Sequence, residues 1–237
     1  MRHICLIFVL GNAVLLAPAG ELKGGDEKSL FNGKDLAGWK FRGGDMAAKK
    51  SKWTVVRDVR PGDKGFASLE GAGVVLNGDD GRGADLLTDL VHGDCQLYIE
   101  FNIAKGSNSG VYFMGQYEVQ ILDSWGKADK DLKFGDCGGI YNHAPPKVNA
   151  SRPPGEWQWF DVVFRAPRFD GSGAKIANAR FIKVVHNGKV VQDNVEVKGP
   201  TTAALGGKET PQGPLMLQGD HGPVAFRAIR LRPVDLK

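Results

Sequence analysis

Apolar and polar residues alternate with a period of two along much of this chain, a pattern typical of β-strands that bury one face. The clearest case is residues 96–103, in which Leu97, Ile99 and Phe101 share one side. The predicted strands cover residues 53–56, 73–76, 84–87, 95–103, 110–114, 117–124, 157–164, 179–185, 189–192, 215–218 and 224–232. No segment has an amphipathic helical period longer than a turn or two.

Turn signals separate these strands at intervals of roughly 8 to 12 residues, which indicates an all-β sandwich. Asn187-Gly188 predicts a type I′ hairpin, because both residues tolerate a positive φ. Alternation fails near Arg227, where we expect a β-bulge. Residues 198–213 are rich in glycine and are predicted to form a long surface loop.

The N-terminus has the form of a secretory signal peptide. An apolar run over residues 4–17 follows two polar residues and ends in the A-x-A sequence at 17–19. The run is too short to span a membrane. We therefore expect a signal peptide at 1–19, a disordered leader at 20–28 and a single domain at 29–237. The mature protein is expected to be secreted or periplasmic, without membrane insertion after cleavage.

Composition and charge exclude several classes of function. The chain has 31 Lys and Arg against 27 Asp and Glu, with both signs mixed along its length. A net charge of +4 so distributed does not predict a nucleic-acid-binding protein. No phosphate-binding loop, dinucleotide fingerprint, Gly-x-Ser-x-Gly elbow or His-Glu-x-x-His motif is present.

Two cysteines, Cys95 and Cys137, remain once Cys5 leaves with the signal peptide. In an oxidising compartment they can pair as a disulfide. Each can equally be a separate buried thiol, because cysteine packs as a small apolar side chain.

The predicted strand at 117–124 carries polar groups that packing does not require. Val119 and Ile121 face one way, whereas Glu118 and Gln120 face the other. The carboxylate and the amide would stand about 7 Å apart, which suits the binding of a sugar. The alternative is a half-buried strand with a solvated outer face.

Aromatic and polar residues gather in the proline-rich loops after this strand. Trp125, Tyr141 and Trp157 offer flat apolar faces on which a pyranose ring can stack. Trp157 can equally be a core residue. His143 is a weaker candidate in the same region.

Glu118 and Asp123 do not fit the carboxylate pair of an ordinary glycosidase without a bulge between them. Five residues of ideal strand span about 16 Å and place the two side chains on opposite faces. A retaining pair requires about 5–5.5 Å between carboxyl groups, and an inverting pair about 6.5–9.5 Å.

A second group of polar residues follows the predicted strand at 215–218. Gln218, Asp220 and His221 lie in a glycine-rich turn. An accessible histidine can exchange a proton near neutral pH, so His221 is a candidate general base or metal ligand. The alternative is an ordinary turn histidine.

Short blocks of sequence occur in a fixed order along nearly the whole mature chain. They lie at residues 30–39, 106–111, 117–123, 139–141, 144–145, 153–157, 186–188, 217–222 and 226–229. In this order they resemble the 3-keto-disaccharide hydrolase domain family, long catalogued as a domain of unknown function. The resemblance implies a concanavalin- or laminarinase-like jelly-roll β-sandwich of two antiparallel sheets, acting on sugars whose C3 hydroxyl has been oxidised.

The chain departs from the family pattern at two positions. Gly219 is inserted before Asp220, and Ala228 stands where the family tends to have Asn. The insertion can displace His221, and the alanine can remove a local hydrogen bond.

A C3 ketone acidifies the proton on C2, and its removal allows elimination at C1 followed by addition of water. Such a reaction needs one base and a group that stabilises the enolate oxygen. We expect Glu118 and His221 to act as base or as ligands of a divalent metal, with Gln120, Asp123, Tyr141 and Gln218 orienting the sugar. The competing interpretations are a non-catalytic carbohydrate-binding module and an ordinary glycosidase.

Overall fold

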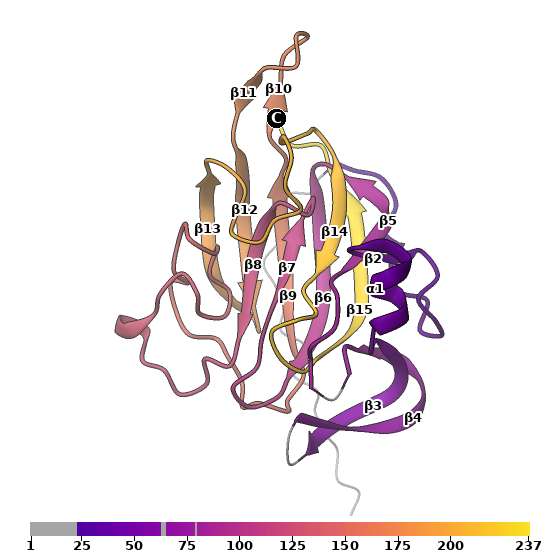
Figure 1. The fold of residues 1–237 in the computed structure, drawn as a ribbon. Helices are drawn as coiled ribbons and strands as arrows, with labels where there is room; N and C mark the ends of the chain where they lie inside the picture. Colours follow the sequence, from indigo (N-terminus) through magenta and orange to yellow (C-terminus); the bar gives the residue numbers. More distant parts are fainter. Residues whose placement is uncertain (1–22, 63–64, 79) are drawn as a thin grey trace, which may run out of the picture.

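Two antiparallel sheets pack face to face in this protein. The computed structural model describes residues 23–62, 65–78 and 80–237. Figure 1 shows the smaller sheet in front of the larger one. The predicted jelly-roll sandwich of two antiparallel sheets is confirmed.

The larger sheet has the strand order β13 (Lys189–Val197), β12 (Ala179–His186), β9 (Gln158–Arg165), β6 (Cys95–Ile103), β15 (Val224–Pro233), β4 (Gly65–Leu76) and β3 (Thr54–Gly62), with β1 (Lys28–Ser29) paired to β15. The smaller sheet has the order β2 (Trp39–Phe41), β5 (Leu86–His92), β14 (Gly213–Leu217), β7 (Asn108–Phe113) and β8 (Tyr117–Leu122). Outside these sheets lie the ribbon of β10 (Arg168–Phe169) and β11 (Lys175–Ala177), the helix α1 (Gly44–Lys50) and a 3₁₀ turn at Asp129–Asp131.

The core fills the space between the two sheets. On β6 the inward residues Leu97, Ile99 and Phe101 are fully buried, as the alternation predicts. Phe113 from the smaller sheet packs against Phe164 from the larger one, with ring centroids 5.0 Å apart. Apolar burial of this kind stabilises the sandwich and fixes which face of each strand points outward.

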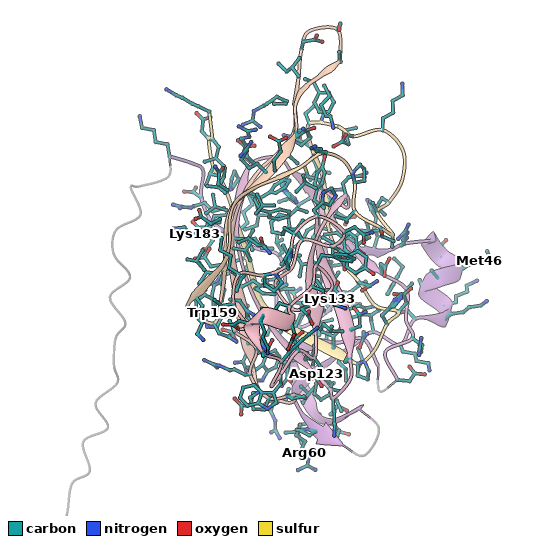
Figure 2. The ribbon with its side chains drawn as sticks, turned by 90° about the vertical axis from the view of Figure 1, so that its left-hand side faces the viewer. Met46, Arg60, Asp123, Lys133, Trp159 and Lys183 are labelled. Carbon is teal, nitrogen blue, oxygen red and sulfur yellow. The ribbon has the colours of Figure 1, made fainter. Side chains whose placement is uncertain are left out.

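Several local elements were not predicted from the sequence, among them helix α1 and the outer half of the β3–β4 hairpin. Helix α1 contributes no buried residue to the core, so its sequence carries no apolar period from which it could have been predicted. Figure 2 shows its Met46 extending away from the sheets. The β3–β4 hairpin extends beyond the predicted runs at 53–56 and 73–76. Its outer half is largely exposed and polar, so the sequence has no alternating pattern there to predict it. No helix within the described residues is long and apolar enough to cross a membrane.

The predicted hairpin and bulge are both present. Asn187 and Gly188 have φ values of 48° and 84° between β12 and β13. The pairing of β15 with β6 shifts register between Arg227 and Arg230, and Ala228 adopts a left-handed φ of 50°. Asn tolerates this left-handed conformation better than Ala does, which explains why the family that the chain resembles tends to have Asn at this position.

The prediction of a disordered leader is wrong for residues 23–28. Gly24 bridges Val234, and Lys28 pairs with Leu231. The reason is that β4 pairs with only the first part of β15, at Ala225 and Phe226, which leaves an edge for the leader to cover. The predicted signal peptide at 1–19 and residues 20–22 lie outside the described residues.

Cys95 and Cys137 are both buried and not bonded to each other. The alternative of two separate buried thiols therefore holds. Burial raises the pKa of the Cys137 thiol to about 12, so this side chain packs as a neutral group.

Replacing Ala228 by Asn is expected to stabilise the protein. Ala228 is exposed and its left-handed backbone costs less for Asn, so the free energy of unfolding should rise by about 0.5–1 kcal/mol. Urea unfolding followed by circular dichroism measures this change. Ala174→Asn is the control, at an exposed position without a positive φ. An equal change in both variants would contradict the explanation.

Candidate functional site

A small cavity lies on the outer face of the smaller sheet. Its volume is about 110 Å³, and it is lined by Asn108, Tyr112, Glu118, Gln120, Tyr141, Thr202, Ala203, Gln218 and His221. Val119 and Ile121 point into the core, so Glu118 and Gln120 point outward from β8. The orientation predicted from alternation is confirmed, and this face is covered rather than solvated, because Glu118 is only 3% exposed.

The pairing of β7 with β8 builds the floor of the cavity. Tyr112 pairs with Glu118, and Gly110 pairs with Gln120. A Cβ atom on Gly110 would lie 2.1 Å from Oε1 of Glu118, so the carboxylate lies across the glycine backbone. No other residue type leaves that space, because every other side chain begins with this atom. The Gln120 amide donates to Asn108 Oδ1 at 3.1 Å.

The segment between β13 and β14 crosses the outer side of the smaller sheet (Figure 1), and its Thr202 and Ala203 form one wall of the cavity. The Thr201 hydroxyl accepts a hydrogen bond from the Glu118 backbone N–H at 3.1 Å. The Tyr112 hydroxyl donates to the Thr202 carbonyl at 3.2 Å. Leu205 packs against an apolar cluster that includes Tyr112. Residues 198–213 contain no strand before Gly213, as expected for a loop, but the loop packs onto the sheet and covers Glu118.

One ion pair ties this wall to the opposite one. Arg42 lies 3.1 Å from the carboxylate of Asp85, which is largely buried. The same guanidinium donates to the carbonyls of Ala203 at 2.8 Å and Ala204 at 2.9 Å. The other oxygen of Asp85 accepts from the Gly219 N–H at 3.0 Å, beside Gln218 and His221 on the other wall. This charged pair therefore links the two walls of the cavity.

Glu118 is a perturbed acid. The pKa of its carboxyl group is raised to about 8, mainly by burial and in smaller part by the negative charges of Asp85 and Asp220, while the neighbouring Tyr112 hydroxyl opposes this rise. A carboxylate with a raised pKa is a stronger base than an ordinary one. A buried, perturbed carboxyl group in a cavity is typical of a catalytic acid or base.

The structure brings His221 into the same cavity as Glu118, although 103 positions separate them in the chain. Strand β14 pairs with β7, and the Gln218 N–H donates to the Gly110 carbonyl at 3.0 Å, which places the following turn beside Glu118. His221 is half-exposed, and its Nδ1 hydrogen-bonds to the Asp220 carboxylate.

The inserted Gly219 does not remove His221 from the cavity. Its backbone fits tightly, since a Cβ atom there would lie 2.4 Å from the Ala84 carbonyl oxygen. Its own carbonyl accepts from Gly83 and Asn77, at 2.9 and 3.1 Å.

One polar atom in the cavity remains available for a ligand. The Gln218 side-chain oxygen is buried and has no hydrogen-bond partner among the described residues. A buried acceptor left unpaired costs free energy, so a bound hydroxyl group would be favoured there.

Five residues expected in the site do not line the cavity. Asp123 accepts a hydrogen bond from the Gly106 N–H at 2.8 Å and so fixes the turn before β7. Trp125 is 57% exposed, and His143 is exposed on the loop after Ile140. The ring of Trp157 packs against the guanidinium of Arg227 on the larger sheet. The distance from the guanidinium carbon to the ring centroid is 3.9 Å. Asp220 stays at the rim, where it contacts His221.

The sequence did not reveal Asn108, Tyr112, Thr202 and Ala203 as cavity residues. Asn108 and Tyr112 share an outward face with Gly110, so pairing the run at 108–113 with 117–122 would have found them. Thr202 and Ala203 belong to a loop without periodicity, so no pattern marks them.

The hypothesis of a divalent metal is not favoured by the donor set. Within residues 23–62, 65–78 and 80–237, no group of three or more His, Cys, Asp and Glu side chains converges as a metal site. Glu118 and His221 supply two ligands between them, and Nδ1 of His221 already bonds to Asp220. No step in the reaction proposed below passes through a metal.

Comparison with known proteins identifies relatives of this chain. A family described as the 3-keto-alpha-glucoside-1,2-lyase-like domain matches residues 26–232. The 3-keto-disaccharide hydrolase of Bacteroides thetaiotaomicron is 24% identical over 238 residues, covering 87% of this chain and 78% of the relative.

Two solved structures from Parabacteroides distasonis, each described as a candidate glycosyl hydrolase, have the same fold. The first is 27% identical with a TM-score of 0.64, covering 94% of this chain and 95% of the other. The second is 20% identical with a TM-score of 0.60, covering 88% and 94%.

Replacing Glu118 by Gln is expected to stabilise the protein at alkaline pH. The folded pKa of about 8 lies above the ordinary value of 4.5, so the unfolded chain ionises first and the wild type loses stability as pH rises between these values. Each unit corresponds to about 1.4 kcal/mol. Allowing for partial hydration, we expect a gain of about 2 kcal/mol at pH 9, or about 4–8 °C in Tm.

Thermal unfolding at pH 9 and near pH 4 tests this expectation. Near pH 4 both states are protonated, so the variant and the wild type should unfold together. Glu156→Gln is the control, because Glu156 is exposed and lies outside the cavity. A Tm difference for Glu118→Gln that does not change with pH would contradict the raised pKa.

Proposed function

This chain belongs to the family of 3-keto-alpha-glucoside-1,2-lyase-like domains, and we propose that it cleaves the glycosidic bond of sugars that carry a ketone at C3. The family and the relatives support a glycoside hydrolase-like function at the coarser level. The observation that carries the finer proposal is the single buried carboxyl group of Glu118, with its raised pKa, in a cavity that also contains His221.

The cavity suits an elimination better than a direct displacement at C1. A displacement with two carboxylates needs a second acid at a fixed distance. Asp123, the nearest acid along the strand, does not line the cavity. Elimination from a 3-keto sugar needs one base, because the ketone already acidifies the C2 proton.

In the proposed reaction Glu118 removes the proton from C2, and the electron pair of that bond moves to the C3 oxygen as an enolate. The pair then forms the C1–C2 double bond while the bond from C1 to the leaving oxygen breaks. The leaving oxygen takes a proton from a water molecule that His221 holds at the rim. The resulting hydroxide adds to C1 while Glu118 returns its proton to C2, which releases the 3-keto sugar.

The remaining cavity residues bind and orient the sugar. The Gln218 oxygen accepts from a sugar hydroxyl, and the amides of Gln120 and Asn108 lie on the same side of the sheet. Tyr112 donates to the Thr202 carbonyl in the free protein. Its hydroxyl is a donor beside Glu118 that stays neutral, because burial raises the pKa of this phenol above its ordinary range.

We also propose that the protein acts outside the inner membrane, as a secreted or periplasmic enzyme. The support for this is the signal-peptide pattern at residues 1–19.

Glu118→Gln is expected to lower kcat/KM for a 3-keto-glucoside at least about 100-fold, because the amide cannot take up the C2 proton. The assay follows release of the leaving group from 3-keto-glucosides and from unoxidised glucosides, with and without a chelator. The wild type should cleave only the oxidised series, and Glu156→Gln should match the wild type. Unchanged turnover by Glu118→Gln would contradict the proposal, and binding without turnover by the wild type would favour a carbohydrate-binding module.

The pH dependence of the same assay distinguishes a base from an acid. A base must be ionised, so kcat/KM should rise with pH and level off above about 8, the pKa of Glu118. A profile that falls above this pH would assign Glu118 as a proton donor, as in an ordinary glycosidase.

A further inference from the structure

Phe134 is a large apolar side chain at the surface beside the cavity. Its side chain remains 43% exposed. Its ring meets the ring of Tyr141 edge to face, with centroids 5.6 Å apart and an interplanar angle of 85°. Tyr141 in turn lines the cavity that contains Glu118. The two rings therefore form a continuous aromatic surface from the cavity to solvent.

Backbone hydrogen bonds fix this aromatic surface relative to Glu118. The segment that leads to Tyr141 runs beside β8 as an additional edge, with the Gln120 N–H donating to the Gly139 carbonyl at 2.9 Å. The Tyr141 N–H donates to the Glu118 carbonyl at 3.3 Å. The Phe134 carbonyl packs against Gly139, where a Cβ atom would lie only 2.3 Å away.

An acidic residue holds the same loop from its other side. Asp136 is buried and forms an ion pair with Lys127 at 2.6 Å. Its carboxylate also accepts from the Lys133 N–H at 2.7 Å, one residue before Phe134. The side chain of Lys133 is visible on this loop in Figure 2. The position of Phe134 is thus set by the fold, although its ring is exposed.

The size of the cavity determines what lies on this surface. Pockets that enclose a drug-sized ligand have volumes of about 300–1,000 Å³. This cavity, at about 110 Å³, is much smaller than that, so it cannot enclose two sugar rings. The group attached at C1 must therefore lie outside the cavity, against its rim.

We propose that Phe134 and Tyr141 form a binding subsite for the leaving group, which favours substrates whose leaving group is a ring with an apolar face, either a second sugar or an aryl group. The subsite rests on the proposed function, because the ketone-bearing ring occupies the cavity. Aromatic faces bind the C–H faces of sugar rings and other aromatic rings, whereas a methyl group is too small to cover them.

The test compares two 3-keto-glucosides, one with a methyl and one with an aryl leaving group, together with a 3-keto disaccharide. Phe134→Ala is expected to lower kcat/KM for the aryl glucoside and the disaccharide about fivefold or more, mainly through KM. Turnover of the methyl glucoside should not change. Phe134→Tyr should retain the activity of the wild type on all three substrates.

Trp125→Ala is the matched control, since Trp125 is a more exposed aromatic residue of the same loop that does not line the cavity. This variant should behave as the wild type. An equal loss on all three substrates, or no loss on any, would overturn the subsite. Failure of the wild type to cleave any of the three 3-keto substrates would instead overturn the proposed function, and the subsite with it.

Discussion

The burial of one carboxyl group against one glycine organises this site. Glu118 lies across the backbone of Gly110 on the paired strand, in a space that a single methyl group would fill. Its desolvation is unfavourable for the ionised form, which is why its pKa rises to about 8. The fold therefore holds a group that costs stability when ionised, and such a group is retained where a reactive base is needed.

Two different physical effects keep the carboxyl group buried. The jelly roll fixes the outward face of β8 by placing Val119 and Ile121 in the core. The loop between β13 and β14 then covers this face, held by the ion pair of Arg42 with Asp85. Because Asp85 also raises the pKa of Glu118, the same residue links the walls and tunes the acid between them.

Periodicity predicted the parts of the site that lie on strands, and the blocks of family sequence predicted the jelly roll. The outward direction of Glu118 and Gln120 follows from alternation alone. The approach of His221 depends on β14 pairing with β7, which no local pattern specifies. Trp125 and Trp157 were misplaced because they lie in loops, whose course is set by contacts distant in the chain.

The most direct test is the titration of the Glu118 carboxyl group by carbon NMR, with Glu118→Gln used to assign its signal. The account predicts a midpoint near 8, because burial withdraws the carboxylate from water. A midpoint near the ordinary value of 4.5 would show that the group is solvated. Glu118 would then have no special capacity as a base, and the proposed reaction would lose its physical support.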